Sequence, residues 1–235
     1  MIKCIFAHYI NKEDAEEIVK QGFDYVIALS WSPEVYDYFK EHGVKVFRWI
    51  RDREVLSEKD IEFIKEYSYG AVLDPETKVW SPRYQEYYCD YLIELHRKVK
   101  IVGTCAWAYP LPIFKKLGTV LINKIFGINI NCAGVSVGSI YTDWGLCFPM
   151  CYPQRRFLAD IRVRWMLEGW AKIKEDYTTN VFPILQAFSK AELNEGSDTW
   201  KPTKEQLSRW VEWVEELGFY GVSFFCWDTY KKSYI

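Results

Sequence analysis

Short apolar runs alternate with amphipathic stretches along the whole chain. Nearly continuous apolar runs of this length are typical of parallel strands that are buried on both faces. Hairpin signals such as Asn-Gly are missing between consecutive runs, so the pattern does not favour antiparallel neighbours. The eight runs cover residues 3–9, 24–30, 45–50, 70–76, 100–107, 144–150, 181–189 and 221–230.

Helix signals occupy the intervals between these runs. Asn11, Ser32, Ser57 and Thr203 are residue types that cap helix N-termini, and apolar positions at helical spacing follow each of them. We therefore predict helices after the first three caps and over residues 81–95, 160–177 and 203–217. The stretch at about 108–143 is a longer excursion, with a candidate helix at 111–126 and a Gly- and Ser-rich segment after it.

Eight strand-and-helix units in 235 residues approach the size of a minimal (β/α)8 barrel. Residues 22–31 and 218–227 share a Gly-Phe-strand-Trp pattern, which fits rotational pseudo-symmetry. The rival fold is an open doubly wound sheet, but residues 6–9 after the first run carry no glycine for a phosphate-binding turn. We predict an α/β protein in which residues 1–235 form a single (β/α)8 TIM barrel.

The net charge limits the kinds of partner that the protein can bind, and the cysteine content indicates its cellular compartment. A net charge of −2 argues against a nucleic-acid or anionic-membrane surface, which needs a basic face. Seven Cys without paired spacing indicate reduced thiols. We expect a cytoplasmic protein without a signal peptide or transmembrane segment, although a phage-type lysin would look the same. The sequence leaves the oligomeric state open.

Aromatic residues make up 18% of the chain, which excludes a disordered protein. This excess has two interpretations, since aromatic rings can fill a core or form stacking platforms for a flat ligand. Helical positions such as Tyr84, Tyr88 and Trp210 fit packing against the wall of a barrel. Other indoles fall at or just after strand ends, where barrel enzymes bind their substrates: Trp31, Trp49, Trp80, Trp107 and Trp227.

Asp74 and Glu76 are the sharpest chemical feature. A period of two places both carboxyl groups on the same face at the end of the fourth strand. Two carboxylates so close cannot both ionise easily, so one pKa should rise, as a general acid requires near neutral pH. The alternative is an Asp-Pro-Glu turn in which Asp74 accepts backbone hydrogen bonds and Glu76 is solvated.

Further polar and aromatic groups accompany the other strand ends. Tyr152 offers a phenol as a hydrogen-bond donor, and Asp228 beside Trp227 could hold sugar hydroxyls. Gln186 is a polar residue within an apolar run, so it must bind a ligand or pair with a neighbour such as Arg48. His8 ends the first run. Glu192 and Glu195 follow the seventh run and are either solvated or a second catalytic carboxylate.

Several of these positions together resemble a known family. Asp74-Pro75-Glu76 is similar to the D-x-E that ends strand four of family 18 chitinase-type barrels, and Met150-Cys151-Tyr152 to the M-x-Y that ends strand six. Trp227 matches the Trp that ends strand eight, and residues 181–230 resemble the C-terminal pattern of related glycosidase barrels. The resemblance implies that Glu76 donates a proton, Asp74 modulates it or orients the substrate, Tyr152 steadies the reacting sugar and Trp227 stacks beneath it.

The chain also departs from the chitinase pattern. Gly70, Ala71 and Val72 stand where the family has further Asp residues, and Pro153 replaces an Asp after M-x-Y. These losses argue against the substrate-assisted mechanism and an N-acetyl sugar.

We therefore expect a glycoside hydrolase that cleaves an oligo- or polysaccharide by carboxylate acid/base catalysis at the C-terminal face of the barrel. The alternative is a non-catalytic carbohydrate-binding or structural barrel. We expect no cofactor, and we expect no metal site because His8, His42 and His96 are scattered and no H-E-x-x-H or C-x-x-C occurs. The candidate binding residues are Trp227, Asp228, Gln186, Trp107, Trp49, Trp31, His8 and Arg48, with Glu76, Asp74 and Tyr152 as the candidate catalytic set.

Overall fold

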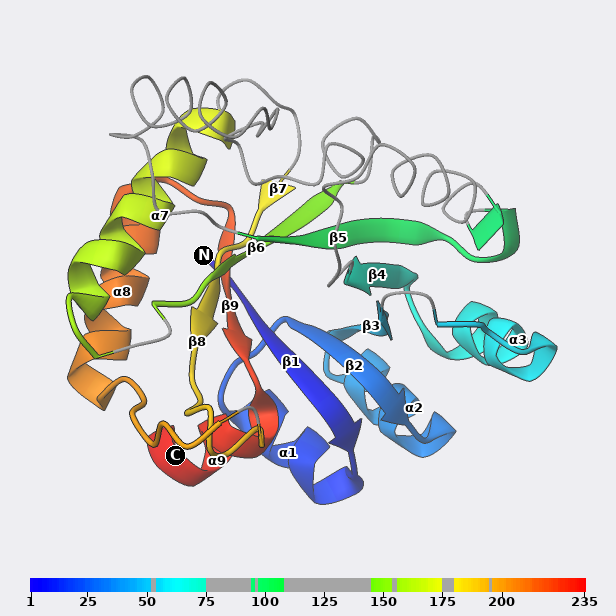
Figure 1. The fold of residues 1–235 in the computed structure, drawn as a ribbon. Coiled ribbons are helices and arrows are strands. Elements are labelled where there is room, and N and C mark those ends of the chain that lie inside the picture. Colours follow the sequence, from blue (N-terminus) through cyan, green and yellow to red (C-terminus); the bar gives the residue numbers. More distant parts are fainter. Residues whose placement is uncertain are drawn as a thin grey trace.

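The computed structural model is a closed ring of parallel strands with helices on its outside (Figure 1). It describes residues 1–51, 54–74, 94–95, 97–107, 145–153, 156–174, 180–194 and 196–235. The strands are β1 (Ile2–Ile10), β2 (Tyr25–Trp31), β3 (Lys45–Arg51), β4 (Ala71–Asp74), β5 (Ile101–Trp107), β6 (Leu146–Cys151), β7 (Asn180–Val181), β8 (Ile184–Gln186) and β9 (Gly221–Phe225).

The ring closes because β5 pairs with β6 and β1 pairs with β9. Two short strands, β7 and β8, together make the seventh side of the ring. Asn180 pairs with Leu146 and Ile184 pairs with Met150, so both strands run alongside β6 at one constant register. The barrel therefore has eight parallel strands, as the sequence predicts.

The helices begin where the sequence places their caps. Asn11, Ser32, Ser57 and Thr203 each accept a hydrogen bond from a backbone N–H of the following first turn, which satisfies a donor that the helix itself leaves unpaired. The described helices are α1 (Lys12–Lys20), α2 (Pro33–Glu41), α3 (Glu58–Tyr67), α7 (Ala159–Lys174), α8 (Lys204–Glu216) and α9 (Trp227–Tyr234).

Some predictions fall outside the described residues. These include most of the predicted helix at 81–95, the excursion at 108–143, and the residues Glu76, Trp80, His96 and Glu195. Among the helices that the structure describes, none combines the length and apolar character needed to cross a bilayer.

The predicted eighth strand is too long. β9 ends at Phe225, and Trp227 and Asp228 lie in the first turn of α9 rather than at a strand end. Trp227, Tyr230 and Tyr234 have the three- and four-residue spacing of one helical face, which packs against the rest of the outer core. That spacing was the available signal for a helix.

The core has two layers that follow the alternation of the strands. Inward-facing residues such as Phe6, Trp49 and Phe148 fill the barrel, with the Phe6 ring centroid 5.7 Å from that of Trp49 and 5.6 Å from that of Phe148. Outward-facing residues such as Val26 and Phe224 pack against the helices. The barrel interior is therefore solid and leaves function to the strand ends.

The seam between β1 and β9 leaves no room for a side chain at its start. Gly221 pairs with Ile2, and a Cβ at this glycine would lie 2.5 Å from the Ile2 carbonyl oxygen and 2.5 Å from the Phe182 ring. Such an approach is far closer than ordinary van der Waals contact, so the seam requires glycine here.

We predict that Gly221→Ala destabilises the protein by about 1–3 kcal/mol, because the strands must separate to admit the methyl group. Gly169→Ala in α7 is the matched control, since nothing lies within 4 Å of its added Cβ. The control should be neutral or stabilise by about 0.5–1 kcal/mol through helix propensity. Urea unfolding of the two variants measures both effects, and equal stabilities would contradict the packing argument.

Candidate functional site

The C-terminal ends of the strands converge on a mouth that is lined by aromatic and polar side chains. Phe225 of β9 lies at its centre, with ring centroids 5.5 Å from Trp49, 5.6 Å from Phe188 and 6.0 Å from His8. Tyr152, which follows β6, lies 6.3 Å from Phe225 by the same measure. We call Trp49, Tyr152, Phe188 and Phe225 the mouth aromatics.

Asp74 is the buried carboxylate of this mouth. It is the last residue of β4 and only 5% exposed. The indole Nε1–H of Trp49, on the neighbouring strand β3, donates a hydrogen bond of 3.1 Å to its Oδ2. A buried carboxylate needs such donors to remain in place, so the two predicted residues Trp49 and Asp74 form one unit.

Tyr152 is held as a neutral phenol. Desolvation by burial raises the pKa of Tyr152 well above its ordinary value of 10, and the nearby Cys105 and the charge of Asp74 raise it further. The phenol therefore keeps its proton across the physiological range. A neutral phenol can donate a hydrogen bond, and the role of Tyr152 as a donor to a ligand stays a prediction.

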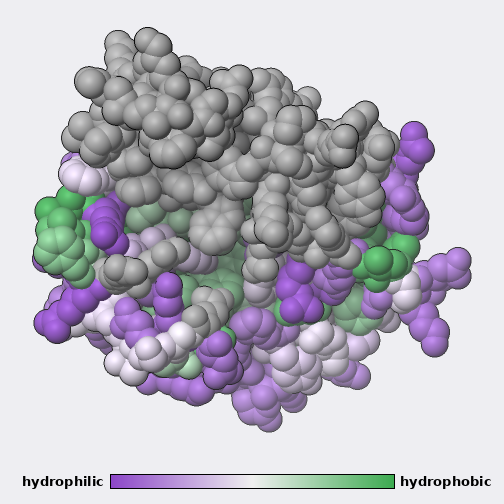
Figure 2. Space-filling view, viewed as in Figure 1, coloured by the Kyte–Doolittle hydropathy of each residue, from purple (hydrophilic) through white to green (hydrophobic). Residues whose placement is uncertain are grey.

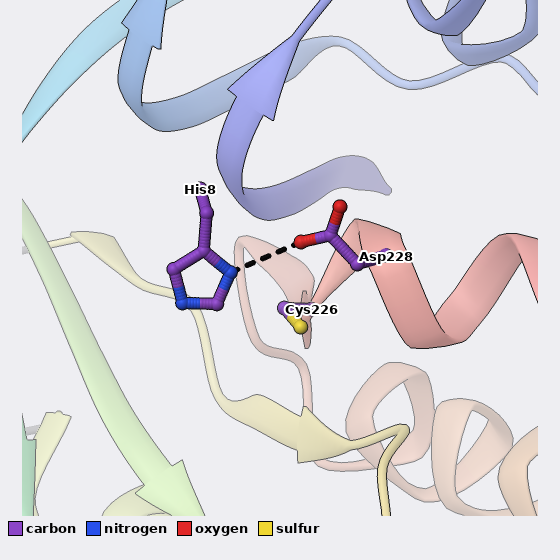
Figure 3. Close-up of side chains that lie close together, drawn as sticks. All are labelled: His8, Cys226 and Asp228. Carbon is purple, nitrogen blue, oxygen red and sulfur yellow. Dashed lines mark hydrogen bonds and ion pairs between the residues drawn. The ribbon is translucent and has the colours of Figure 1, made fainter. Parts of the chain in front are cut away.

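His8 and Asp228 form an ion pair beside Trp49, whose ring centroid lies 5.6 Å from that of His8 (Figure 3). Nδ1 of His8, near the end of β1, lies 3.0 Å from Oδ2 of Asp228 in α9. The hydrogen bond with Asp228 raises the pKa of His8 to about 9, and a second hydrogen bond with Cys226 acts in the same direction. His8 therefore carries a positive charge at neutral pH.

The same ion pair lowers the pKa of Asp228. His8 and Asp228 were separate predictions of ligand-binding residues, and the pairing of β1 with β9 brings them together. Cys226 completes the group. It precedes α9 and its side chain is buried, whereas those of its two neighbours are half exposed.

Gln186 lies inside the barrel at the end of β8. Its Nε2 donates to the carbonyl oxygen of Phe188 at 2.9 Å, which ties the strand to the loop that follows. The predicted pairing with Arg48 is wrong, because Arg48 lies on the outward side of β3. The Arg48 guanidinium binds Glu54 and the Trp49 carbonyl instead, so it does not reach the mouth.

Trp31 and Trp227 also turn away from the mouth, which corrects the prediction that they form sugar platforms. Trp31 packs on Phe63 at 5.5 Å between ring centroids and donates to the Tyr67 carbonyl of α3. Trp227 has no exposed surface, and its Nε1 donates to Asp14 at 2.7 Å. Both indoles belong to the outer core.

Two further predicted residues lie at the limit of the described region. Trp107 ends β5 and its backbone pairs with Met150, but its side chain lies outside the described residues, as does all of Glu76.

Glu192 lies in the loop after β8, where its carboxylate accepts hydrogen bonds from the Ser189 amide and hydroxyl and from Lys201.

Solved structures share this architecture. A chitinase from Chromobacterium violaceum aligns with a TM-score of 0.58 at 7% identity, covering 96% of this chain and 94% of its own. The PgaB (BpsB) glycoside hydrolase domain from Bordetella bronchiseptica aligns with a TM-score of 0.55 at 10% identity and the same coverages. This chain shares the (β/α)8 barrel fold of these two proteins.

A xylanase-A-amylase inhibitor protein, XAIP-III, also aligns, with a TM-score of 0.51 at 15% identity over 97% of this chain and 95% of its own. No protein-family model matches the sequence, and the comparison with curated proteins gives no significant match. At these identities the likeness establishes the fold, and the chemistry must be argued from the residues of the mouth.

Sequence reasoning missed Phe225 and Cys226. It expected the last strand to present Trp227, but β9 ends two residues earlier and Phe225 takes the inward position at the mouth. The available signal was the alternation of the strand itself, in which Ser223 and Phe225 share a face. Cys226 carries no signal of its own, because its neighbour His8 lies at the other end of the chain.

The surface around the barrel is mixed. Figure 2 shows hydrophilic residues over the lower part of this face and a hydrophobic patch at its left edge, on the side where α7 and α8 lie in Figure 1. Phe157, Ile161 and Trp165 are exposed apolar side chains; Ile161 and Trp165 lie on α7, and Phe157 precedes this helix.

We predict that Asp228→Asn returns the pKa of His8 from about 9 towards its ordinary value of 6.5, because the carboxylate partner of the imidazolium is lost. The ¹H–¹³C NMR titration of His8 measures the shift, with Asp24→Asn as a control carboxylate. Both partners are more than a third exposed, so solvent screening makes the energy of the pair small.

The direction of the pH dependence follows from the raised pKa. The pair stabilises the fold fully below pH 6.5, and this contribution is lost as the pH rises through about 9. Wild type should therefore lose stability relative to Asp228→Asn over this range. Parallel stability curves for the two proteins would contradict the assignment.

Proposed function

We propose that the protein is a glycoside hydrolase that cleaves an oligo- or polysaccharide by carboxylate acid/base catalysis at the barrel mouth. The observation that carries the proposal is Asp74, a buried carboxylate that is held by the Trp49 indole among the mouth aromatics. Hydrolysis of a glycosidic bond is commonly performed by a pair of carboxyl groups in such a setting.

Glu76 is the proposed proton donor and Asp74 its partner. Asp74 is fixed by its hydrogen bond and lies out of water, so its charge acts strongly on nearby groups. Glu76 follows two residues later along the chain. A carboxylate of this kind raises the pKa of a neighbouring carboxyl group, which then holds a proton for the leaving oxygen.

Tyr152 is the proposed hydrogen-bond donor to the reacting sugar. Its raised pKa keeps the phenol neutral, and the charge of Asp74 is one of the causes of that shift. Phe225 replaces Trp227 as the proposed aromatic surface beneath the sugar, because it faces the mouth and contacts Trp49, Phe188 and His8.

A non-catalytic carbohydrate-binding barrel is the second candidate. It is favoured by the pairing of Asp228 with His8, which commits the other described carboxylate near the mouth to an ion pair. The likeness to XAIP-III, which is described as an inhibitor protein, supports the same candidate. Binding of oligosaccharides without release of products distinguishes this candidate from the hydrolase.

We predict that Glu76→Gln lowers kcat/KM by about 10²–10⁴-fold on any hydrolysed oligosaccharide, because the proton for the leaving group is lost. The measurement is product release from a panel of chitin, peptidoglycan, xylan and glucan fragments. Asp74→Asn should also reduce kcat, since it removes the charge that modulates the donor.

Glu216→Gln is the matched control. Glu216 is an exposed carboxylate of α8 that pairs with Arg164 on the outside of the barrel, so its loss should leave the rate unchanged. Wild-type turnover with undiminished activity in Glu76→Gln would refute the catalytic assignment. Binding of the panel without turnover by wild type would establish the second candidate instead.

A further inference from the structure

Three groups with metal-binding chemistry converge at the seam of the barrel. They are the imidazole of His8, the thiol of Cys226 and the carboxylate of Asp228, and one ligand atom from each lies within 4.8 Å of the other two. Nδ1 of His8 and Oδ2 of Asp228 are 3.0 Å apart. Figure 3 shows the imidazole and the carboxylate facing each other, with the Cys226 sulfur beside the line that joins them. We propose that His8, Cys226 and Asp228 bind a divalent transition metal, with zinc as the favoured ion.

The distances suit a zinc ion after small adjustments. Tetrahedral zinc has bonds of about 2.0–2.3 Å, which place its ligand atoms roughly 3.3–3.8 Å apart. The His8–Asp228 pair at 3.0 Å must open slightly, and the widest separation, up to 4.8 Å, must close. Both partially exposed side chains can make these changes by rotation, while the backbone of the seam stays in place.

The types of donor select the metal. A thiolate, an imidazole and a carboxylate are all ligands of zinc, whereas magnesium and calcium prefer oxygen alone. Three protein ligands leave a fourth position of the tetrahedron for water or another oxygen. Because His8 and Asp228 are half exposed at the mouth, that position can be reached from solvent.

The surroundings hold the three ligands in place. The hydroxyl of Thr229 donates to the Cys226 carbonyl at 3.0 Å and lies 3.7 Å from its sulfur, which fixes the thiol at the start of α9. Lys231, the cation one helical turn from Asp228, binds Asp14 and does not occupy the site. Pairing of β1 with β9 sets the spacing between His8 and the two C-terminal ligands.

The ion would also join the two ends of the barrel. It would link the first strand to the helix that follows the last strand, so it should stabilise the folded state, and more so the tighter it binds. This role is independent of the proposed glycosidase activity, which rests on Asp74 and Glu76. Failure of one proposal therefore leaves the other standing.

The test is metal binding to metal-depleted protein in mildly alkaline buffer, where zinc can displace the proton that His8 shares with Asp228 and the proton of the Cys226 thiol, both of which pass to the buffer. Zinc is titrated in competition with a chromophoric chelator, and cobalt is added separately as a spectroscopic probe. We expect one zinc per chain, a rise in Tm with zinc, and a thiolate-to-cobalt charge-transfer band.

The variants are His8→Gln, Cys226→Ser and Asp228→Asn. Cys226→Ser should abolish the charge-transfer band, and the other two should weaken zinc binding by at least about tenfold. The matched controls are Cys147→Ser, which removes another buried thiol, and His42→Gln, which removes an exposed imidazole just after α2. Both controls should bind zinc as wild type does.

Undiminished zinc affinity in His8→Gln and Asp228→Asn would overturn the proposal, as would a charge-transfer band that persists in Cys226→Ser. If Cys226→Ser does not fold, the two variants at half-exposed positions decide the question. An ion pair without metal affinity predicts no saturable zinc binding to the wild type, and that result would also reject the site.

Discussion

The pairing of β1 with β9 is the interaction on which the rest of the molecule depends. Five consecutive residues of β1, from Ile2 to Phe6, lie in register with Gly221 to Phe225, and this pairing turns a row of strands into a ring. A closed ring has no free edge, and it forces inward side chains to fill the space they enclose. Both the aromatic interior and the mouth follow from this closure.

The interior explains much of the aromatic excess. Phe6, Trp49, Phe148 and Phe225 meet mainly edge-to-face, an arrangement that aromatic quadrupoles favour. The upper members of this stack are also the floor of the mouth, so packing and ligand contact share the same rings. Replacing one of these rings to change ligand binding therefore also changes the packing of the barrel core below it.

Strand and helix positions could be predicted because each depends on a short, local stretch of sequence. Apolar runs gave the strands, and Asn11, Ser32, Ser57 and Thr203 gave the helix starts. The fold class followed from their order, and the likeness to chitinase-like barrels is confirmed at the level of the fold. The candidate site was predicted less well, and its central residue Glu76 lies outside the described region.

The orientation of individual indoles could not be predicted, because it depends on where each strand leaves the barrel. Trp49 packs in the barrel interior, whereas Trp31 at the end of β2 and Trp227 in the first turn of α9 pack in the outer core. The neighbourhood of His8, Cys226 and Asp228 depends on the register of two strands from opposite ends of the chain. Once a barrel is assumed, however, its first and last strands must be neighbours, so the proximity of His8 and Asp228 could have been predicted.

The position of β1 also has a consequence for biosynthesis. β1 is made early and finds β2 nearby, but its other edge stays open until β9 and α9 have been translated. During that interval a strand rich in apolar residues presents unpaired backbone groups, which other nascent chains can bind. The nascent chain is therefore vulnerable to aggregation until β9 and α9 emerge, and expression should benefit from chaperones that shield exposed strand edges.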